Sequence, residues 1–307
     1  MPLDPQVRAW LDAGRAAGAR PYEELGVEAA RRVVDLNAAD LFGPLEEVAR
    51  AEDVELDGVP GRVYEPVEAR AGALVWLHGG GWVIGSLESH DPLCRALAAR
   101  SGSAVVAVDY RLAPEHPHPA ALEDAWTATT WAVREFGAVA VGGDSAGGHL
   151  AAVVALRARD RGVPLRLQAL VVPVTNYAFD TSSYAENGTG FGLERATIEW
   201  FWGLYVPDRA DAGDPEVSPL RAEDVSATAP AVVVTAEYDP VRDEGEAYAL
   251  KLRDAGVDVD HHRVAGMLHG FLRMPGVIER ANETIDHVAA RVREALSDGA
   301  RVEPIDA

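Results

Sequence analysis

Short, continuous apolar runs recur along the chain and are typical of strands that are buried on both faces of a sheet. These predicted strands occupy residues 73–77, 104–108, 138–141, 167–172 and 231–235, followed by a last strand at 257–264. Segments with the spacing of helices separate the strands. The predicted helices occupy residues 91–100, 120–135, 149–156 and 241–255, followed by a closing helix at 275–296. This alternation predicts an α/β fold with a mostly parallel sheet, helices on both faces, and a functional site at the carboxyl ends of the strands.

Two parts of the chain depart from this alternation. Residues 1–48 contain two stretches with helical spacing, and an antiparallel strand pair near residues 54–64 follows them. Residues 176–228 are too long for a simple loop and contain a helix near 194–205 that is crowded with aromatic side chains. We therefore expect the α/β domain to carry a helical cap. The expected boundaries are residues 49–175 and 229–307 for the α/β domain, and residues 1–48 and 176–228 for the cap.

Composition and charge exclude several classes of partner. The 307 residues carry a formal net charge of −21, which opposes binding to nucleic acid or to an anionic membrane. No apolar run reaches roughly 18 residues, so no transmembrane helix is expected. Cys94 is the only cysteine, which excludes an internal disulfide, and residues 1–5 lack the charged-then-apolar plan of a signal peptide. These observations predict a cytoplasmic protein.

The stretch Gly143-Asp144-Ser145-Ala146-Gly147 stands between a predicted strand and a predicted helix. A strand, a sharp turn with G-x-S-x-G, and a helix form the pattern of a nucleophile elbow, which lifts a serine hydroxyl above the sheet. The glycines leave room for neighbouring backbone at a strained turn, and the helix start adds free N–H groups. A chain with 29 glycines can hold this pattern by chance, so the assignment of Ser145 as a nucleophile depends on finding its partners.

A serine nucleophile needs a base to take its proton and a third group to orient that base. In an architecture with this elbow, the acid follows the serine in sequence and the histidine comes last. Asp239 lies at a turn just after the predicted strand at 231–235, and His269 lies between the last strand and the closing helix. The sequence therefore predicts a triad of Ser145, Asp239 and His269.

Other titratable residues fit these roles less well. Asp109 ends a strand but precedes the serine, and His261 and His262 lie within a predicted strand. His116 and His118 could form a metal pair, but no carboxylate cluster accompanies them. We therefore expect no metal site.

A glycine-rich stretch follows the strand at 73–77 and has the sequence His78-Gly79-Gly80-Gly81-Trp82. Attack at a carbonyl creates an oxyanion, which needs hydrogen-bond donors already in place. Glycines allow the backbone to approach that oxygen closely. We predict that the N–H groups of Gly80, Gly81 and Ala146 form an oxyanion hole, that His78 braces this loop, and that Trp82 forms a wall of the pocket.

Taken as a set, these motifs resemble those of the bacterial hormone-sensitive-lipase-like (family IV) esterases, which belong to the α/β-hydrolase superfamily. The residues that carry the resemblance are 78–82, 109–115, 143–148, 218–220, 239–245 and 269–271. The resemblance implies an eight-stranded sheet with a helical cap, hydrolysis of short- to medium-chain carboxylic esters, and no cofactor. It also implies a homodimer that pairs through the last strand and the closing helix. One departure is His149, where asparagine is common in the family.

The leading hypothesis is a serine carboxylesterase that acts on a small-molecule ester. Two alternatives stay open at this point. The first is an amidase or deacetylase of a specific metabolite, because the same triad serves those reactions and some formamidase-like relatives share a Ser-Ala-Gly-x-His-Leu run. The second is a non-catalytic small-molecule receptor, which the presence of all three triad residues disfavours. The aromatic residues expected to line the substrate pocket are Trp82, Trp200, Phe201 and Phe271.

Overall fold

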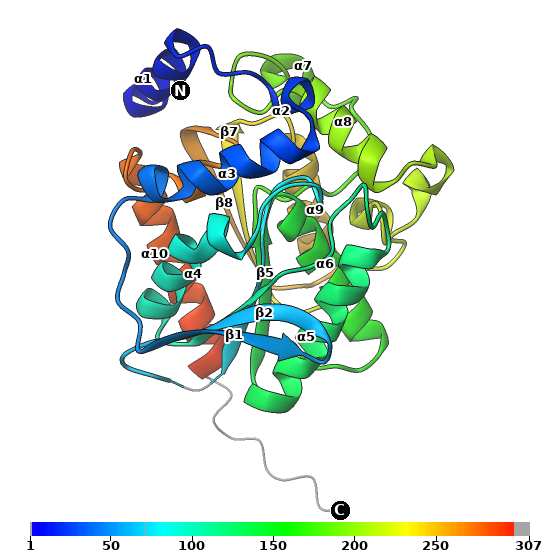
Figure 1. Cartoon of the computed structure of the whole chain (residues 1–307). Coiled ribbons are helices and arrows are strands. Elements are labelled where there is room, and N and C mark those ends of the chain that lie inside the picture. The colour runs from blue at the N-terminus through cyan, green and yellow to red at the C-terminus, as the bar shows by residue number, and fades with distance from the viewer. Residues whose placement is uncertain (1, 71, 298–307) are drawn as a thin grey trace, which may run out of the picture.

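An eight-stranded sheet runs through the centre of the molecule, with the strand order β1-β2-β4-β3-β5-β6-β7-β8 (Figure 1). In the computed structural model, which describes residues 2–70 and 72–297, β2 pairs with β1 and β4 in antiparallel fashion and all other pairs are parallel. The strands are β1 (Arg50–Leu56), β2 (Val59–Glu65), β3 (Ala73–Leu77), β4 (Ala104–Val108), β5 (Val139–Asp144), β6 (Leu167–Val171), β7 (Ala231–Tyr238) and β8 (Val259–Leu268). The prediction of a mostly parallel sheet is confirmed.

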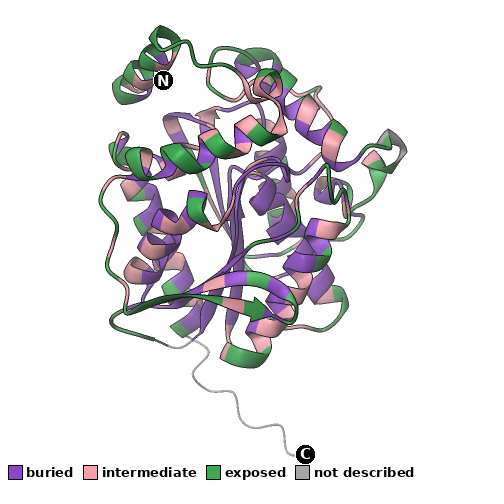
Figure 2. Ribbon diagram, viewed as in Figure 1, coloured by how far each residue is buried: buried purple, intermediate pink, exposed green. Residues whose placement is uncertain are grey.

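The central strands β3 to β7 are buried on both faces, which explains why they are mostly apolar, whereas β1 at the edge of the sheet is mostly exposed (Figure 2). Val75 and Leu77 of β3 belong to one hydrophobic cluster, whereas Leu74 and Trp76 belong to the cluster on the opposite face. Helices α5, α6 and α9 contribute to the first cluster, and α4 and α10 contribute to the second. These helices are α4 (Leu87–Ser101), α5 (Ala120–Phe136), α6 (Ala146–Asp160), α9 (Arg242–Asp254) and α10 (Glu279–Ser297).

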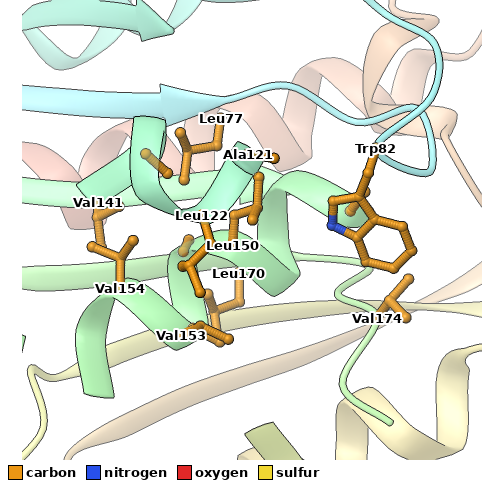
Figure 3. Packing of buried hydrophobic residues seen from close by; sticks show 14 of the residues in the cluster. Leu77, Trp82, Ala121, Leu122, Val141, Leu150, Val153, Val154, Leu170 and Val174 are labelled. Atoms are coloured by element: carbon orange, nitrogen blue, oxygen red, sulfur yellow. The ribbon is translucent and has the colours of Figure 1, made fainter. Parts of the chain in front are cut away.

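Side chains of α5 and α6 pack against the face of the sheet that carries Val75 and Leu77. Figure 3 shows Leu77, Val141 and Leu170, from three neighbouring strands, beside Leu150 and other residues of α6. Each of these four side chains is fully buried. Such burial contributes about 1.5–3 kcal/mol for each large aliphatic side chain, so this contact holds α6, and the turn before it, firmly against the sheet.

A second group of helices gathers at one end of the sheet (Figure 1). They are α1 (Pro5–Ala16), α2 (Tyr22–Leu25), α3 (Val27–Phe42), α7 (Ser182–Asn187) and α8 (Arg195–Tyr205). Short 3₁₀ turns complete the chain at η1 (Arg209–Gly213), η2 (Pro219–Arg221) and η3 (Phe271–Arg273). The sequence pattern did not predict α7, which is short and polar. Within residues 2–70 and 72–297, no helix is long and apolar enough to cross a lipid bilayer.

The carboxyl ends of four strands deliver the residues that the sequence singles out. His78 follows β3, Ser145 follows β5, Asp239 follows β7 and His269 follows β8, each as the next residue after the strand. Because these four strands run parallel, their ends lie at the same edge of the sheet. The fold therefore gathers residues that are up to about 190 positions apart in sequence.

Glu244 is a buried carboxyl group that fastens the segment after β6 to α9. Its Oε1 atom accepts hydrogen bonds from the backbone N–H groups of Thr175 (2.7 Å) and Asn176 (3.3 Å). Its Oε2 atom accepts one from the hydroxyl of Tyr184 at 3.3 Å. Burial raises the pKa of Glu244 to about 8, although these three donors favour its ionised form. The carboxyl group is therefore held mostly protonated below that pH.

We expect the Glu244→Gln variant to gain stability over the wild type as pH rises. Between about pH 4.5 and about pH 8 the folded protein keeps a proton that the unfolded chain has released, so the free energy of unfolding falls as pH rises through this window. Glutamine cannot ionise and keeps an oxygen that accepts the backbone hydrogen bonds. The difference in the free energy of unfolding between Glu244→Gln and the wild type should grow by at most about 1.4 kcal/mol for each pH unit. It should level off above about pH 8. Urea unfolding at several pH values from 5 to 9 measures it.

Glu223→Gln serves as the matched control, because Glu223 is exposed and its replacement should not change the pH dependence of stability. A stability difference between wild type and Glu244→Gln that stays constant across the pH range would contradict this account of Glu244.

Candidate active site

Ser145 sits on a backbone turn that only a glycine-flanked sequence can form. Its φ of 56° and ψ of −117° lie in a region that side chains rarely adopt. A Cβ atom on Gly147 would lie 1.8 Å from the carbonyl oxygen of Leu77, and one on Gly143 would lie 2.4 Å from the same oxygen. The glycines therefore let the turn press against the end of β3, and Ser145 stands partly exposed at the start of α6.

The three side chains of the predicted triad lie in hydrogen-bonding contact. The Nε2 atom of His269 lies 2.8 Å from the Oγ atom of Ser145, and its Nδ1 atom lies 2.8 Å from the Oδ2 atom of Asp239. An ionised carboxylate only accepts hydrogen bonds, so the Nδ1–H group donates to Asp239 and Nε2 is left to accept from the serine hydroxyl. The Asp239 side chain is 1% exposed and the His269 side chain 9% exposed. The geometry suits proton transfer from serine to histidine.

Contacts from α7 fix the turn that carries Asp239. The side-chain amide of Asn187 donates to the carbonyl oxygen of Asp239 at 3.3 Å. The hydroxyl of Ser183 donates to the carbonyl oxygen of Pro240 at 2.6 Å, and its backbone N–H donates to Asp243 at 2.8 Å. Asp243 therefore braces this turn through Ser183, whereas Asp239 is the carboxylate that contacts His269.

The loop after β3 presents free N–H groups beside the serine. Among the residues that the structure describes, the backbone N–H groups of Gly80, Gly81 and Ala146 have no hydrogen-bond acceptor. Gly80 has a φ of +123°, and a Cβ atom there would lie 2.1 Å from the backbone oxygen of Ile84. Gly81 has a φ of +58°, and a Cβ atom there would collide with the ring of Phe201 at 2.2 Å. Both positions therefore require glycine.

A buried carboxylate ties this loop to the serine turn. The Oδ1 atom of Asp144 accepts from the N–H of Gly79 at 3.1 Å and lies 3.2 Å from the Nε2 atom of His90. Burial would raise the pKa of Asp144, but His90 and the guanidinium of Arg273 hold it below its usual value. Burial also lowers the pKa of His90, so a neutral imidazole donates to an ionised Asp144. No sequence motif points to His90.

His78 braces the same loop, as predicted. Its ring stacks on that of Tyr110 with centroids 4.1 Å apart, and the hydroxyl of Tyr110 donates to its carbonyl oxygen at 2.7 Å. Burial lowers the pKa of His78 to about 3, so it remains neutral at physiological pH. The Nδ1 atom of His78 lies 2.9 Å from the carbonyl oxygen of Gly79, and the contact with the Ser145 hydroxyl is made by His269 instead.

A cavity of about 390 Å³ opens over Ser145 and His269. Trp82 and Phe201 line it, whereas Trp200 and Phe271 are missing from the described residues that do. The lining positions of α8 include 197, 198, 201 and 202, which form one helical face, and Trp200 lies off that face. Phe271 is fully buried in the core beneath α10. The other side chains around the cavity include Trp10, Leu11, Val33, Val34, Leu41, Leu193, Leu268, Arg273 and Met274.

His149, which departs from the family pattern, has a structural environment. His149 is fully buried, does not line the cavity, and packs edge-on against Trp82 with ring centroids 5.1 Å apart. Its Nε2 atom lies 3.1 Å from the carbonyl oxygen of Val217. His149 therefore lies behind the cavity wall, where it supports Trp82. Within the described part of the chain, His116 and His118 belong to no group of three or more residues that could hold a metal ion.

Comparison with known proteins agrees with this architecture. A family model described as alpha/beta hydrolase fold matches residues 74–273. The chain is 40% identical over 318 residues to an ethyl acetate hydrolase of Pseudomonas putida, in an alignment that covers 96% of this chain and 100% of that protein. It is 42% identical over 295 residues to the carboxylic ester hydrolase LipN of Mycobacterium tuberculosis, with 89% of this chain and 77% of that protein covered.

A solved structure extends the agreement to three dimensions. The hyperthermophilic esterase from the archaeon Pyrobaculum calidifontis superposes with a TM-score of 0.90 at 40% identity, covering 96% of this chain and 99% of that one. The similarity thus spans the helices at the end of the sheet as well as the sheet itself. The chain therefore belongs to the hormone-sensitive-lipase-like family of esterases with the α/β-hydrolase fold.

Proposed function

We propose that the protein is a serine carboxylesterase in which Ser145 is the nucleophile, His269 the general base and acid, and Asp239 the group that orients His269. The observation that carries this proposal is the unbroken contact from Asp239 through His269 to Ser145, with both distances at 2.8 Å. Esterase relatives at about 40% identity support the same reaction class.

The reaction proceeds through an acyl-enzyme. His269 Nε2 takes the hydroxyl proton as Ser145 Oγ attacks the ester carbonyl, and the resulting imidazolium is stabilised by the Asp239 carboxylate. His269 then gives that proton to the departing alkoxide oxygen, which leaves as the alcohol. Water enters, loses a proton to His269, and attacks the acyl group, releasing the carboxylic acid and restoring Ser145.

The free N–H groups of Gly80, Gly81 and Ala146 stabilise the oxyanion that forms at the carbonyl oxygen. Each donor of this kind typically lowers the barrier by roughly 3 kcal/mol. Gly79 takes no part, because its N–H already donates to Asp144. Asp144 therefore acts as a positioning residue, because it holds the loop after β3 beside Ser145.

The N-terminal helices and the 176–228 insertion act as a cap over this site. Trp10 of α1, Leu41 of α3 and Phe201 of α8 all line the cavity. At about 390 Å³ the cavity is near the small end of ligand pockets, which run from roughly 300 to 1,000 Å³. We expect it to accept short- to medium-chain acyl groups.

Replacement of Ser145 by alanine should lower kcat for aryl butyrate hydrolysis on the order of 10⁴-fold or more. The reason is that, among the described residues, Ser145 is the hydroxyl group in hydrogen-bonding contact with His269. Initial rates with aryl esters from acetate to palmitate, for wild type and Ser145→Ala, measure both the loss and the chain-length preference, with the peak expected between acetate and hexanoate.

A fluorophosphonate probe separates this reading from its alternatives. It should label Ser145 in the wild type and leave Ser145→Ala unlabelled. A folded wild type that is labelled but hydrolyses no ester would favour an amidase. Full ester turnover by Ser145→Ala would refute the assignment of the nucleophile.

Replacement of Asp144 by alanine should lower kcat on the order of 10²-fold, with a much smaller effect on KM. The Gly79 N–H loses its acceptor, so the loop that carries the oxyanion donors shifts, and those donors act mainly in the transition state. Asp144→Asn keeps an acceptor oxygen and should lose less. Steady-state kinetics on an aryl butyrate measures the effect.

Asp124→Asn is a matched control, because Asp124 is a buried carboxylate that pairs with Arg111 at 2.8 Å away from the cavity. Circular dichroism establishes that each variant is folded. If Asp144→Ala were folded and kept its wild-type kcat, the positioning role would be wrong.

A further inference from the structure

Arg273 is a cation in the cavity wall that has no partner in the described part of the chain. It ends η3, four residues after His269, and lines the same cavity. Its Nε atom is buried without a hydrogen-bond partner, and its guanidinium takes part in none of the ion pairs that the described residues form. A guanidinium carries five N–H donors and stays charged at all physiological pH values.

The other charged residues that line the cavity all have partners. Arg15 pairs with Asp12 at 3.1 Å, and Arg20 pairs with Glu24 at 3.3 Å. Glu194 accepts from the N–H of Gly190 at 3.2 Å, and the contacts of Asp144 with Gly79 and His90 are described above. Only the charge of Arg273 is left without a direct contact among these lining groups.

Arg273 lies close enough to the loop after β3 to influence it electrostatically. After burial and His90, its charge is the next influence that sets the pKa of Asp144, and it acts on His78 and His90 as well. It nevertheless lies beyond ion-pair distance of Asp144, whose Oδ1 atom is already engaged by the N–H of Gly79. None of the described residues therefore forms an ion pair with the guanidinium.

The surroundings of Arg273 suit a ligand with an apolar stem and an anionic end. Met274, the next residue, and Leu41 line the same cavity, and Asn37 adds an amide to that lining. The N–H of Gly276 donates to the carbonyl oxygen of Leu41 at 3.0 Å, which holds the end of α3 beside the segment after η3. Arginine is the residue best shaped to grip a carboxylate with two parallel hydrogen bonds.

We propose that Arg273 binds a carboxylate on the ester substrate, so that the enzyme prefers esters with an anionic end over neutral esters of the same size. The preferred substrates would be half-esters of dicarboxylic acids or esters of carboxylate-bearing alcohols. The proposal rests on the ester hydrolysis proposed above. It also gives a partner to the one cation among the described lining residues that lacks an ion pair.

Two matched pairs of esters test the proposal and locate the charge. Monoethyl adipate and its terminal amide place the carboxylate or its neutral isostere on the acyl side, and 4-carboxyphenyl and 4-carbamoylphenyl butyrate place it on the alcohol side. In at least one pair, wild type should favour the carboxylate at least tenfold in kcat/KM. Arg273→Met should lose at least tenfold on that carboxylate and less than threefold on its amide. Arg273→Lys should keep part of the preference.

The controls separate this role from a structural one. Arg134→Met removes the same charge from a surface pair with Asp57 and should leave every ratio unchanged. If Arg273 only balanced the charge of Asp144, Arg273→Met would lower the rates for carboxylate and amide alike. Equal losses in both members of each pair, or no loss in either, would overturn the proposal.

A binding measurement keeps the proposal separate from the proposed function. Calorimetry with the Ser145→Ala variant measures the affinity for each carboxylate and amide without turnover, and adding Arg273→Met should weaken binding of the preferred carboxylate alone. If wild type hydrolysed no ester but this difference held, the ester function would fail and carboxylate recognition would stand. If the wild type hydrolysed esters but this difference in affinity were absent, the ester function would stand and carboxylate recognition by Arg273 would fail.

Discussion

Two backbone segments lie closer together at the site than side chains would allow, and the arrangement of the other functional groups depends on that approach. The turn at Ser145 presses against the carbonyl oxygen of Leu77, and any side chain at Gly143 or Gly147 would prevent it. Because the turn after β5 reaches the end of β3, the carboxylate of Asp144 can hold the neighbouring loop through a hydrogen bond from the N–H of Gly79. The glycines thus set the distance between the serine and the free N–H groups opposite it.

Two buried carboxyl groups near this edge of the sheet have opposite properties, and their partners explain the difference. Asp144 lies near an imidazole and a guanidinium, which hold its pKa low and keep it charged in a buried place. Glu244 has only neutral donors, so burial dominates and raises its pKa to about 8. The first group therefore contributes a fixed negative charge beneath the site, whereas the second acts as a largely neutral anchor for the segment after β6.

The sequence predicts the parts of this site that lie in local motifs or directly after buried strands. The glycine-flanked turn identifies Ser145, and strand order places Asp239 and His269 near it. The contacts that hold these groups join distant segments: His90 reaches Asp144 across 54 positions, and no local pattern signals that pairing. Helix α7 is too short to show a period. Which aromatic residues of α8 line the cavity depends on how that helix is rotated, and aromatic content alone does not fix the rotation.

The N-terminal helices not only cover the site but are also hydrogen-bonded to the segments that form it. Arg31 of α3 donates from Nε to the carbonyl oxygen of Val83 at 2.8 Å and from Nη2 to that of Ala113 at 3.0 Å. Its ion pair with Glu115 adds a third anchor. Displacing α3 would therefore release the far end of the loop after β3 and disturb the free N–H groups beside Ser145. Helix α1 is held by different segments: the N–H of Asp4 donates to the carbonyl oxygen of Gly266, the N–H of Glu279 donates to Gln6, and Arg15 donates to the carbonyl oxygen of Gly190. These contacts do not involve the loop after β3, so it is α3 rather than α1 that anchors that loop.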